Sequence, residues 1–191
     1  MDREDQNFDE KKLILRIVEG DKNLFNELYN RYKKQLMLTC LRYIPERTLA
    51  EDTLQESFIA IYRDLEKFDE SKSKFITWAT RITINKCLKK FRKKSVFSKM
   101  EDLLEVQYKL KVRSVAVESL NLEDLTTLIS SLPRGYRAVF NMYVLDGYNH
   151  KEIAEKLDIS ESTSKTQLMR AKRLLKRKLK EEDYTLMESY A

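Results

Sequence analysis

The feature that most constrains this chain is its scarcity of residues that make turns. Only three glycines and two prolines occur among 191 residues. A fold made of many short strands needs a turn signal between strands, which argues against an all-β architecture. Leu, Lys and Glu favour helices and are abundant, and a hydrophobic fraction of 42% suffices for small helical cores. The sequence therefore predicts an all-α fold.

In the first half of the chain, apolar residues recur at helical spacing. This pattern predicts four helices, over residues 9–19, 22–44, 46–65 and 75–94. Gly20 is placed to end the first helix and Asp21 to cap the second, which Pro45 closes. A polar segment precedes the fourth helix.

The predicted helix over 46–65 has a second face that a core does not explain. Asp52, Glu56 and Ile59 lie opposite the apolar stripe, with Gln55 at the border. An exposed Ile beside carboxylates is typical of a protein-binding surface. The alternative, which fits the pattern equally well, is a solvent-exposed face that happens to carry a single Ile.

The predicted helix over 75–94 ends in a basic run without any acid. Its cations are Lys86, Lys89, Lys90, Arg92, Lys93 and Lys94. Aromatic residues are interleaved around it, at Phe68, Phe75, Trp78 and Phe91. Bases of single-stranded DNA stack on aromatic rings while cations hold the phosphates, so this combination suits strand binding. The alternative is that most of these rings are core residues and the cations a solvated helix end.

The second half contains a pattern typical of a helix-turn-helix. Two helices precede it, one over 122–132 and one around Val139–Val144, and Asp146-Gly147 forms a turn. Asn149 and Glu152 resemble a capping box for a helix over 150–157. After a tight turn, Ser160 is placed to cap the last helix, over 161–180.

That last helix is strongly basic. It carries eight Lys or Arg residues against one Glu, a local charge of +7, whereas the whole chain has a net charge of +6. The second helix of such a motif reads the DNA major groove with its N-terminal residues. Ser162, Thr163, Lys165, Thr166 and Arg170 are placed to read bases, and Arg173, Lys176 and Arg177 to hold phosphates.

Signals for catalysis, metal binding and secretion are missing from the sequence. There is a single histidine, His150, and the two cysteines, Cys40 and Cys87, form no CxxC pair. No nucleotide-binding, metalloprotease or serine-hydrolase motif occurs, although a carboxylate-only Mg²⁺ site stays open. No signal peptide or membrane span is recognisable, so we expect a soluble, cytoplasmic protein with reduced thiols, no cofactor and no catalytic residue.

Three segments together resemble the extracytoplasmic-function RNA polymerase sigma factors of the sigma-70 superfamily. They are LAEDTLQESFIAIYRDL, FDESKSKFITWATRITINKCLKKFRKK and LPRGYRAVFNMYVLDGYNHKEIAEKLDISESTSKTQLMRAKRLL. The resemblance implies a transcription initiation factor that binds core RNA polymerase and directs it to promoter DNA. It also implies promoter melting and an anti-sigma factor as a regulatory partner. The sequence does not reveal the oligomeric state, and a monomer is the default expectation for the free protein.

The resemblance also implies a domain organisation of two small helical domains joined by a linker. The divisions are 1–95 for the polymerase-binding and minus-ten domain, 96–120 for the linker, 121–181 for a four-helix domain with the helix-turn-helix, and 182–191 for an acidic tail. The implied polymerase-binding residues are Asp52, Gln55 and Glu56, with Ile59 on the same face.

The predicted DNA-binding residues combine the resemblance with the charge pattern. For the minus-ten element, the resemblance implies Trp78, Arg81 and Asn85 and a loop from Phe68 to Lys74 that captures a flipped base, and the basic run adds Lys89, Lys90, Arg92 and Lys93. For the minus-thirty-five element, the resemblance implies Thr163, Lys165, Arg170 and Ala171, and the polar face of the same helix adds Ser162, Thr166, Gln167, Arg173 and Arg177.

Three positions depart from the family pattern. Ser164 stands on the core-facing stripe where Val is usual, and Asp158 stands in the turn where Gly is frequent. Gln167 stands where Arg is frequent, and Gln pairs with adenine where Arg prefers guanine, so the usual promoter consensus is in doubt.

Other classes of function remain as alternatives. The main one is a stand-alone helix-turn-helix regulator, which would need a sensor or dimerisation domain that residues 24–94 do not suggest. A carboxylate nuclease would reveal itself by metal-dependent DNA cleavage, and a purely protein-binding adaptor fits poorly with the +7 helix.

Overall fold

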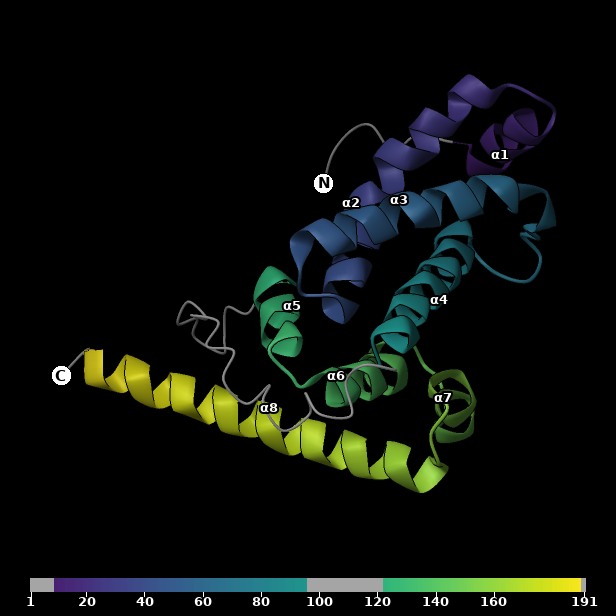
Figure 1. Ribbon diagram of the computed structural model, residues 1–191. Coiled ribbons are helices and arrows are strands. Elements are labelled where there is room, and N and C mark those ends of the chain that lie inside the picture. Colours follow the sequence, from purple (N-terminus) through teal and green to yellow (C-terminus); the bar gives the residue numbers. More distant parts are fainter. Residues whose placement is uncertain (1–8, 96–121, 190–191) are drawn as a thin grey trace.

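The computed structural model describes residues 9–95 and 122–189, and within these ranges every regular element is a helix (Figure 1). The longer helices are α1 (Glu10–Val18), α2 (Phe25–Tyr43), α3 (Arg47–Arg63), α4 (Phe75–Ser95), α5 (Leu122–Ser130), α6 (Arg134–Phe140), α7 (His150–Leu157) and α8 (Glu161–Ser189). Short helical turns are η2 (Lys22–Leu24), η3 (Leu65–Lys67) and the π-helical η6 (Asn141–Leu145). The all-α prediction is confirmed. The predicted linker over 96–120 lies outside the described residues.

The ends of α1 show where local sequence signals operate. Gly20 has a φ of +119°, a conformation that favours glycine, and it follows directly on the helix end as predicted. The predicted role of Asp21 as a helix cap is wrong. Its carboxylate makes no capping hydrogen bond and instead accepts one from Arg16 Nη2 at 2.8 Å, because that guanidinium lies within reach.

Helices α2, α3 and α4 pack together around a buried core. Leu28, Leu36, Ile61 and Phe75 are among its fully buried side chains. Four buried Ser and Thr residues of these helices donate their hydroxyls to the carbonyl four residues earlier in the same helix: Thr39, Thr53, Ser57 and Thr83. A hydroxyl satisfied in this way can be buried without a partner from another helix.

Helices α5 to α8 form the second half of the structure. Leu128 and Leu132 pack with Ala171 and Leu175 of α8. The turn after η6 contains Gly147 at a φ of +75°. The capping box at the start of α7 is confirmed, since Asn149 and Glu152 each accept the backbone N–H of the other. Helix α8 continues past Lys180 to Ser189, further than the sequence pattern indicated.

The two halves of the chain lie against each other. Helix α5 packs beside the C-terminal part of α2, and α7 lies near α4 (Figure 1). One buried apolar cluster contains residues of both halves, including Tyr43 and Leu88 from the first and Met142 and Ile153 from the second. The described part of the chain has no helix long and apolar enough to cross a membrane.

Candidate nucleic-acid interface

The helix-turn-helix is built from α7, a three-residue turn and the start of α8. Asp158 takes the left-handed conformation in the turn, at a φ of +56°, which Asp tolerates better than most residues. Ser160 caps α8, because its Oγ accepts the backbone N–H of Thr163 at 3.0 Å. Both features were predicted. The first residues of α8, Glu161 and Ser162, are exposed.

A polar contact inside the motif was not predicted. Ser164 is fully buried, and its Oγ lies 2.9 Å from Nδ1 of His150 at the start of α7. The His150 ring also stacks on Tyr143, with ring centroids 4.5 Å apart. Ser164 therefore joins the two helices of the motif through a hydrogen bond, where a Val would join them by packing alone.

One long face of α8 is exposed and mostly polar or basic. Its exposed members are Ser162, Lys165, Thr166, Arg170, Arg173, Lys176 and Arg177. Thr163 is half-buried, and its hydroxyl lies 2.8 Å from the hydroxyl of the cap, Ser160. Met169 is also exposed, by 59%, and sequence reasoning did not include it. An apolar side chain beside these polar groups could contact a thymine methyl.

Gln167 lies differently from the other residues assigned to the minus-thirty-five element. Its side-chain amide packs on Gly135 of α6, where an added Cβ would be 3.2 Å from Gln167 Oε1. That oxygen is buried and has no hydrogen-bond partner. Because Gly135 has no side chain, the amide of Gln167 has space to point inward against α6. Base reading by Gln167 stays a prediction, and it requires the side chain to turn outward.

The aromatic residues around the start of α4 form one cluster. Phe75 is fully buried, with its ring centroid 5.6 Å from that of Phe68 and 5.9 Å from that of Trp78. Phe68 and Trp78 are 5.5 Å apart and only half-buried. Phe75 is thus a core residue, as the alternative interpretation held, whereas the other two rings keep surface that a base could contact.

The loop between η3 and α4 is organised by Asp69. Its carboxylate accepts the backbone N–H and the hydroxyl of Ser71, at 3.0 and 2.7 Å, and lies 2.9 Å from Lys72 Nζ. These contacts, above all the bond from the Ser71 hydroxyl, lower the pKa of Asp69 to about 2. Lys74 is exposed where the loop enters α4.

The remaining predicted minus-ten residues lie along α4. Arg81, Asn85 and Lys89 are exposed. The structure does not describe the side chains of Arg92 and Lys93. Lys90 is half-buried, and its ammonium donates to Glu56 of α3 at 2.5 Å.

The Glu56–Lys90 contact joins two sites that the sequence assigned to different partners. The hydrogen bond from Lys90 lowers the pKa of Glu56, with Lys86 and Lys89 adding to the effect. On the same face of α3, Asp52 and Gln55 are exposed, and Ile59 is 68% exposed. The predicted polymerase-binding face and the basic helix are therefore neighbours.

Comparison with known proteins agrees with this geometry. The family description "Sigma-70 region 2" matches residues 28–96, and "Sigma-70, region 4" matches residues 122–175.

Among curated relatives, "ECF RNA polymerase sigma factor SigM" of Bacillus subtilis is 32% identical over 152 residues, covering 79% of this chain and 92% of the relative. "ECF RNA polymerase sigma factor SigW" of the same organism is 30% identical over 182 residues, covering 90% and 97%. The solved structure of the sigma factor RpoE from Bartonella quintana, in complex with the anti-sigma factor NepR, is similar in fold. Its TM-score is 0.51 at 19% identity, over 82% of this chain and 96% of that one. This chain therefore belongs to the extracytoplasmic-function RNA polymerase sigma factors of the sigma-70 family.

Proposed function

We propose that this sigma factor uses three surfaces in promoter recognition. The face of α3 binds core RNA polymerase, the N-terminal part of α8 reads the minus-thirty-five element, and α4 with its preceding loop reads the minus-ten element. One observation favours this over a stand-alone regulator: the chain presents a second basic, aromatic surface, on α4, beside the polar face of α3. A regulator that only binds operators would need a sensor or dimerisation domain beside the helix-turn-helix, and a second nucleic-acid-binding surface would have no role in it.

On the minus-thirty-five element, α8 lies in the major groove of duplex DNA. Ser162, Thr163, Lys165, Thr166 and Arg170 contact base edges near its capped end. Arg173 and Arg177 lie further along the helix and bind phosphates. Gln167 joins the reading residues when it leaves Gly135.

On the minus-ten element, the loop and α4 hold a single strand. Extracting a base from the stack costs a few kcal/mol. The half-buried rings of Phe68 and Trp78 offer stacking surface that offsets part of this cost. Lys74, Arg81, Asn85 and the basic end of α4 contact the strand and its phosphates.

On core polymerase, Asp52, Gln55, Glu56 and Ile59 form the contact. Ile59 supplies apolar area at the centre, and the neighbouring polar groups give orientation. No step of this function requires a catalytic residue or a cofactor in this chain. We also propose an anti-sigma factor as a regulatory partner, because the RpoE structure was determined with one. Promoter DNA and core polymerase place the site of action in the bacterial cytoplasm.

In vitro transcription with core RNA polymerase tests the proposal. Purified protein is added to core enzyme and promoter DNA selected from the host genome, and initiation is expected to depend on it. Asp52→Arg should abolish polymerase pull-down while the helical content by circular dichroism stays unchanged. Glu19→Arg makes the same charge change at the exposed end of α1 and should behave like the wild type.

Arg170→Ala tests the minus-thirty-five assignment separately. Its loss of initiation should be confined to promoters that carry that element, because Arg170 lies on the exposed face of α8. Equal loss on promoters without the element would contradict the assignment. Sequence-specific duplex binding by the free protein, without any affinity for core polymerase, would instead favour the stand-alone regulator.

A further inference from the structure

Among the buried serines and threonines that the structure describes, Ser164 is bonded in a different way from the others. The four in α2, α3 and α4 donate to a carbonyl of their own helix. Ser164 is fully buried on α8, and its Oγ lies 2.9 Å from Nδ1 of His150 on α7. Either atom can be the donor, depending on which ring nitrogen carries the proton. The hydroxyl of Ser164 therefore links two helices.

The ring of His150 is itself held in place. It stacks on Tyr143 of η6, with ring centroids 4.5 Å apart and an angle of 25° between the ring planes. His150 is also the first residue of α7, directly after the capping residue Asn149. Because a hydrogen bond requires both a distance and a direction, a ring fixed in this way restrains where Ser164 can lie.

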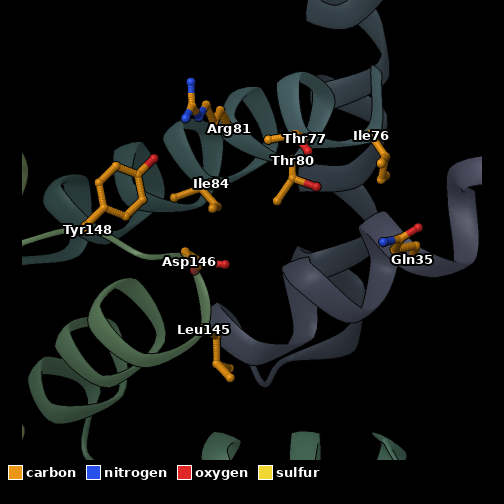
Figure 2. Close-up of a pocket in the computed structure, with 9 residues that line it drawn as sticks. All are labelled: Gln35, Ile76, Thr77, Thr80, Arg81, Ile84, Leu145, Asp146 and Tyr148. Carbon is orange, nitrogen blue, oxygen red and sulfur yellow. The ribbon is translucent and has the colours of Figure 1, made fainter. Parts of the chain in front are cut away.

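The residues just before His150 face α4 instead of α8. Asp146 and Tyr148 line a cavity of about 220 Å³ together with Ile84 and Arg81 of α4 (Figure 2). In this segment, the side chain that bonds to α8 is that of His150.

The position of Ser164 within α8 gives the bond its importance. Ser164 lies between Thr163 and Lys165, two residues assigned to base reading. Side chains end ~5–6 Å from a helix axis, so a rotation of α8 by ~20° would move their ends by ~2 Å. A shift of that size exceeds the range of distances over which a hydrogen bond to a base forms. Apolar contacts such as that of Leu168 are not directional and permit small rotations, whereas a hydrogen bond opposes them.

We propose that His150 and Ser164 act together as positioning residues for recognition of the minus-thirty-five element. Their hydrogen bond sets the orientation of the reading end of α8, and both act through that helix. This inference rests on the function proposed above, in which α8 reads duplex DNA. Phosphate contacts strengthen binding to any sequence, whereas this pair affects which base sequence is preferred.

The first test measures base discrimination by holoenzyme reconstituted from core RNA polymerase and the full chain. Initiation is compared on a promoter that the wild type transcribes and on the same promoter with one base pair of its minus-thirty-five element replaced. The ratio of the two rates is the measured quantity. We expect Ser164→Ala and His150→Phe each to lower this ratio about fivefold, and the double variant to lower it no further, because residues that share one contact are not additive. His150→Phe keeps an aromatic ring for the stack on Tyr143.

Two further variants separate positioning from a general loss of stability. Ser57→Ala makes the same change at a buried serine of α3, whose Oγ donates to the carbonyl of Thr53 at 2.7 Å. It should leave the ratio unchanged. Ser164→Thr keeps the hydroxyl and should retain most of the discrimination. Partial unfolding lowers initiation on both promoters alike and therefore cancels from the ratio.

The second test needs no DNA. Residual dipolar couplings of the backbone amides, measured by NMR on the free protein, give the angle between α7 and α8. We expect Ser164→Ala and His150→Phe each to change this angle by ~10–20°, the range at which a positioned group loses its productive geometry. Ser57→Ala should leave the angle unchanged. His150 is the single histidine of the chain, so its ring nitrogens are identified directly, and Ser164→Ala should shift the Nδ1 signal.

The outcomes separate this inference from the proposed function. Unchanged ratios in both single variants, or losses that multiply in the double variant, would overturn joint positioning even if α8 reads the element. An unchanged helix angle in both variants would also overturn it. A wild-type enzyme that initiates equally on both promoters would instead overturn the proposed reading of the minus-thirty-five element, and the helix angle in the free protein would still decide whether the pair positions α8.

Discussion

Replacement of Arg137 by Ala should destabilise the protein more than any surface change. The Arg137 side chain is only 9% exposed, and it lies where the ends of α2 and α5 meet. Its Nη1 donates to the carbonyls of Ser130 and Leu132, at 3.0 and 2.7 Å, and its Nε donates to the carbonyl of Tyr43. One guanidinium thus supplies donors for carbonyls of both halves.

The magnitude follows from the acceptors that Arg137→Ala would leave without this donor. The bonds to Tyr43 and Leu132 are buried, and the one to Ser130 is partly buried. A buried acceptor that loses a charged donor costs ~1.5–3 kcal/mol, and water entering the vacated space recovers part of this. We expect a loss of ~3–5 kcal/mol in the free energy of unfolding, which corresponds to a fall in Tm of ~10 °C for a chain of this size.

Urea and thermal unfolding followed by circular dichroism at 222 nm measure the effect. Arg137→Lys should fall between Ala and the wild type, because a single ammonium does not match the fork of a guanidinium. Arg173→Ala, on the exposed face of α8, is the matched control and should change stability by less than ~0.5 kcal/mol. A loss below ~1 kcal/mol for Arg137→Ala would refute the reasoning that these carbonyls depend on it.

Three further results are expected. Asp158→Gly should raise Tm by ~2–4 °C. At the φ of +56° found there, a residue other than Gly costs ~1 kcal/mol. An unchanged or lower Tm in a thermal melt would count against this. Gly135→Ala should displace the amide of Gln167 and, since that amide is the end of a flexible side chain, change the free energy of unfolding by less than ~1 kcal/mol in a urea titration. Burial raises the pKa of Asp146 above 3.8 although Arg42 and Tyr43 oppose the shift, so ¹³C NMR titration of its carboxyl should give a midpoint above that value. Because folding raises this pKa above its unfolded value, the stability that protonated Asp146 contributes is fully present below pH 3.8 and is lost as the pH rises through the Asp146 midpoint, which a midpoint at or below 3.8 would contradict.

Local sequence signals predicted much of the fold. The capping box of Asn149 and Glu152, the cap at Ser160 and the left-handed Asp158 each involve residues at most three positions apart, so their chemistry is visible in the sequence. Asp21 shows the limit of such signals. It has the right type for a cap, but an ion pair with Arg16 was a competing use for the same carboxylate.

Contacts between distant residues were not predictable from one sequence. The bonds of Tyr43 with Asp146 and with Arg137 join positions 103 and 94 residues apart, and the Glu56–Lys90 pair spans 34. Sequence spacing assigned Glu56 and Lys90 to separate partners because nothing in their periodicity relates α3 to α4. One sequence feature could have pointed to the role of Arg137. It lies within the otherwise apolar segment Tyr136–Phe140, and a charged residue that is buried among apolar neighbours needs partners for its charge.

The contacts between the end of α2 and the other half of the chain have a consequence for how this protein can diverge. Arg137 donates to the backbone carbonyl of Tyr43 and Asn141 to that of Arg42, and every amino acid carries such a carbonyl. Substitutions at positions 42 and 43 would therefore abolish the contacts with Asp146 but leave the docking of Arg137 and Asn141 in place. Successive substitutions in α2 should weaken the packing of the two halves gradually, whereas a single change at Asn141 or Arg137 removes a contact that no substitution in α2 can restore.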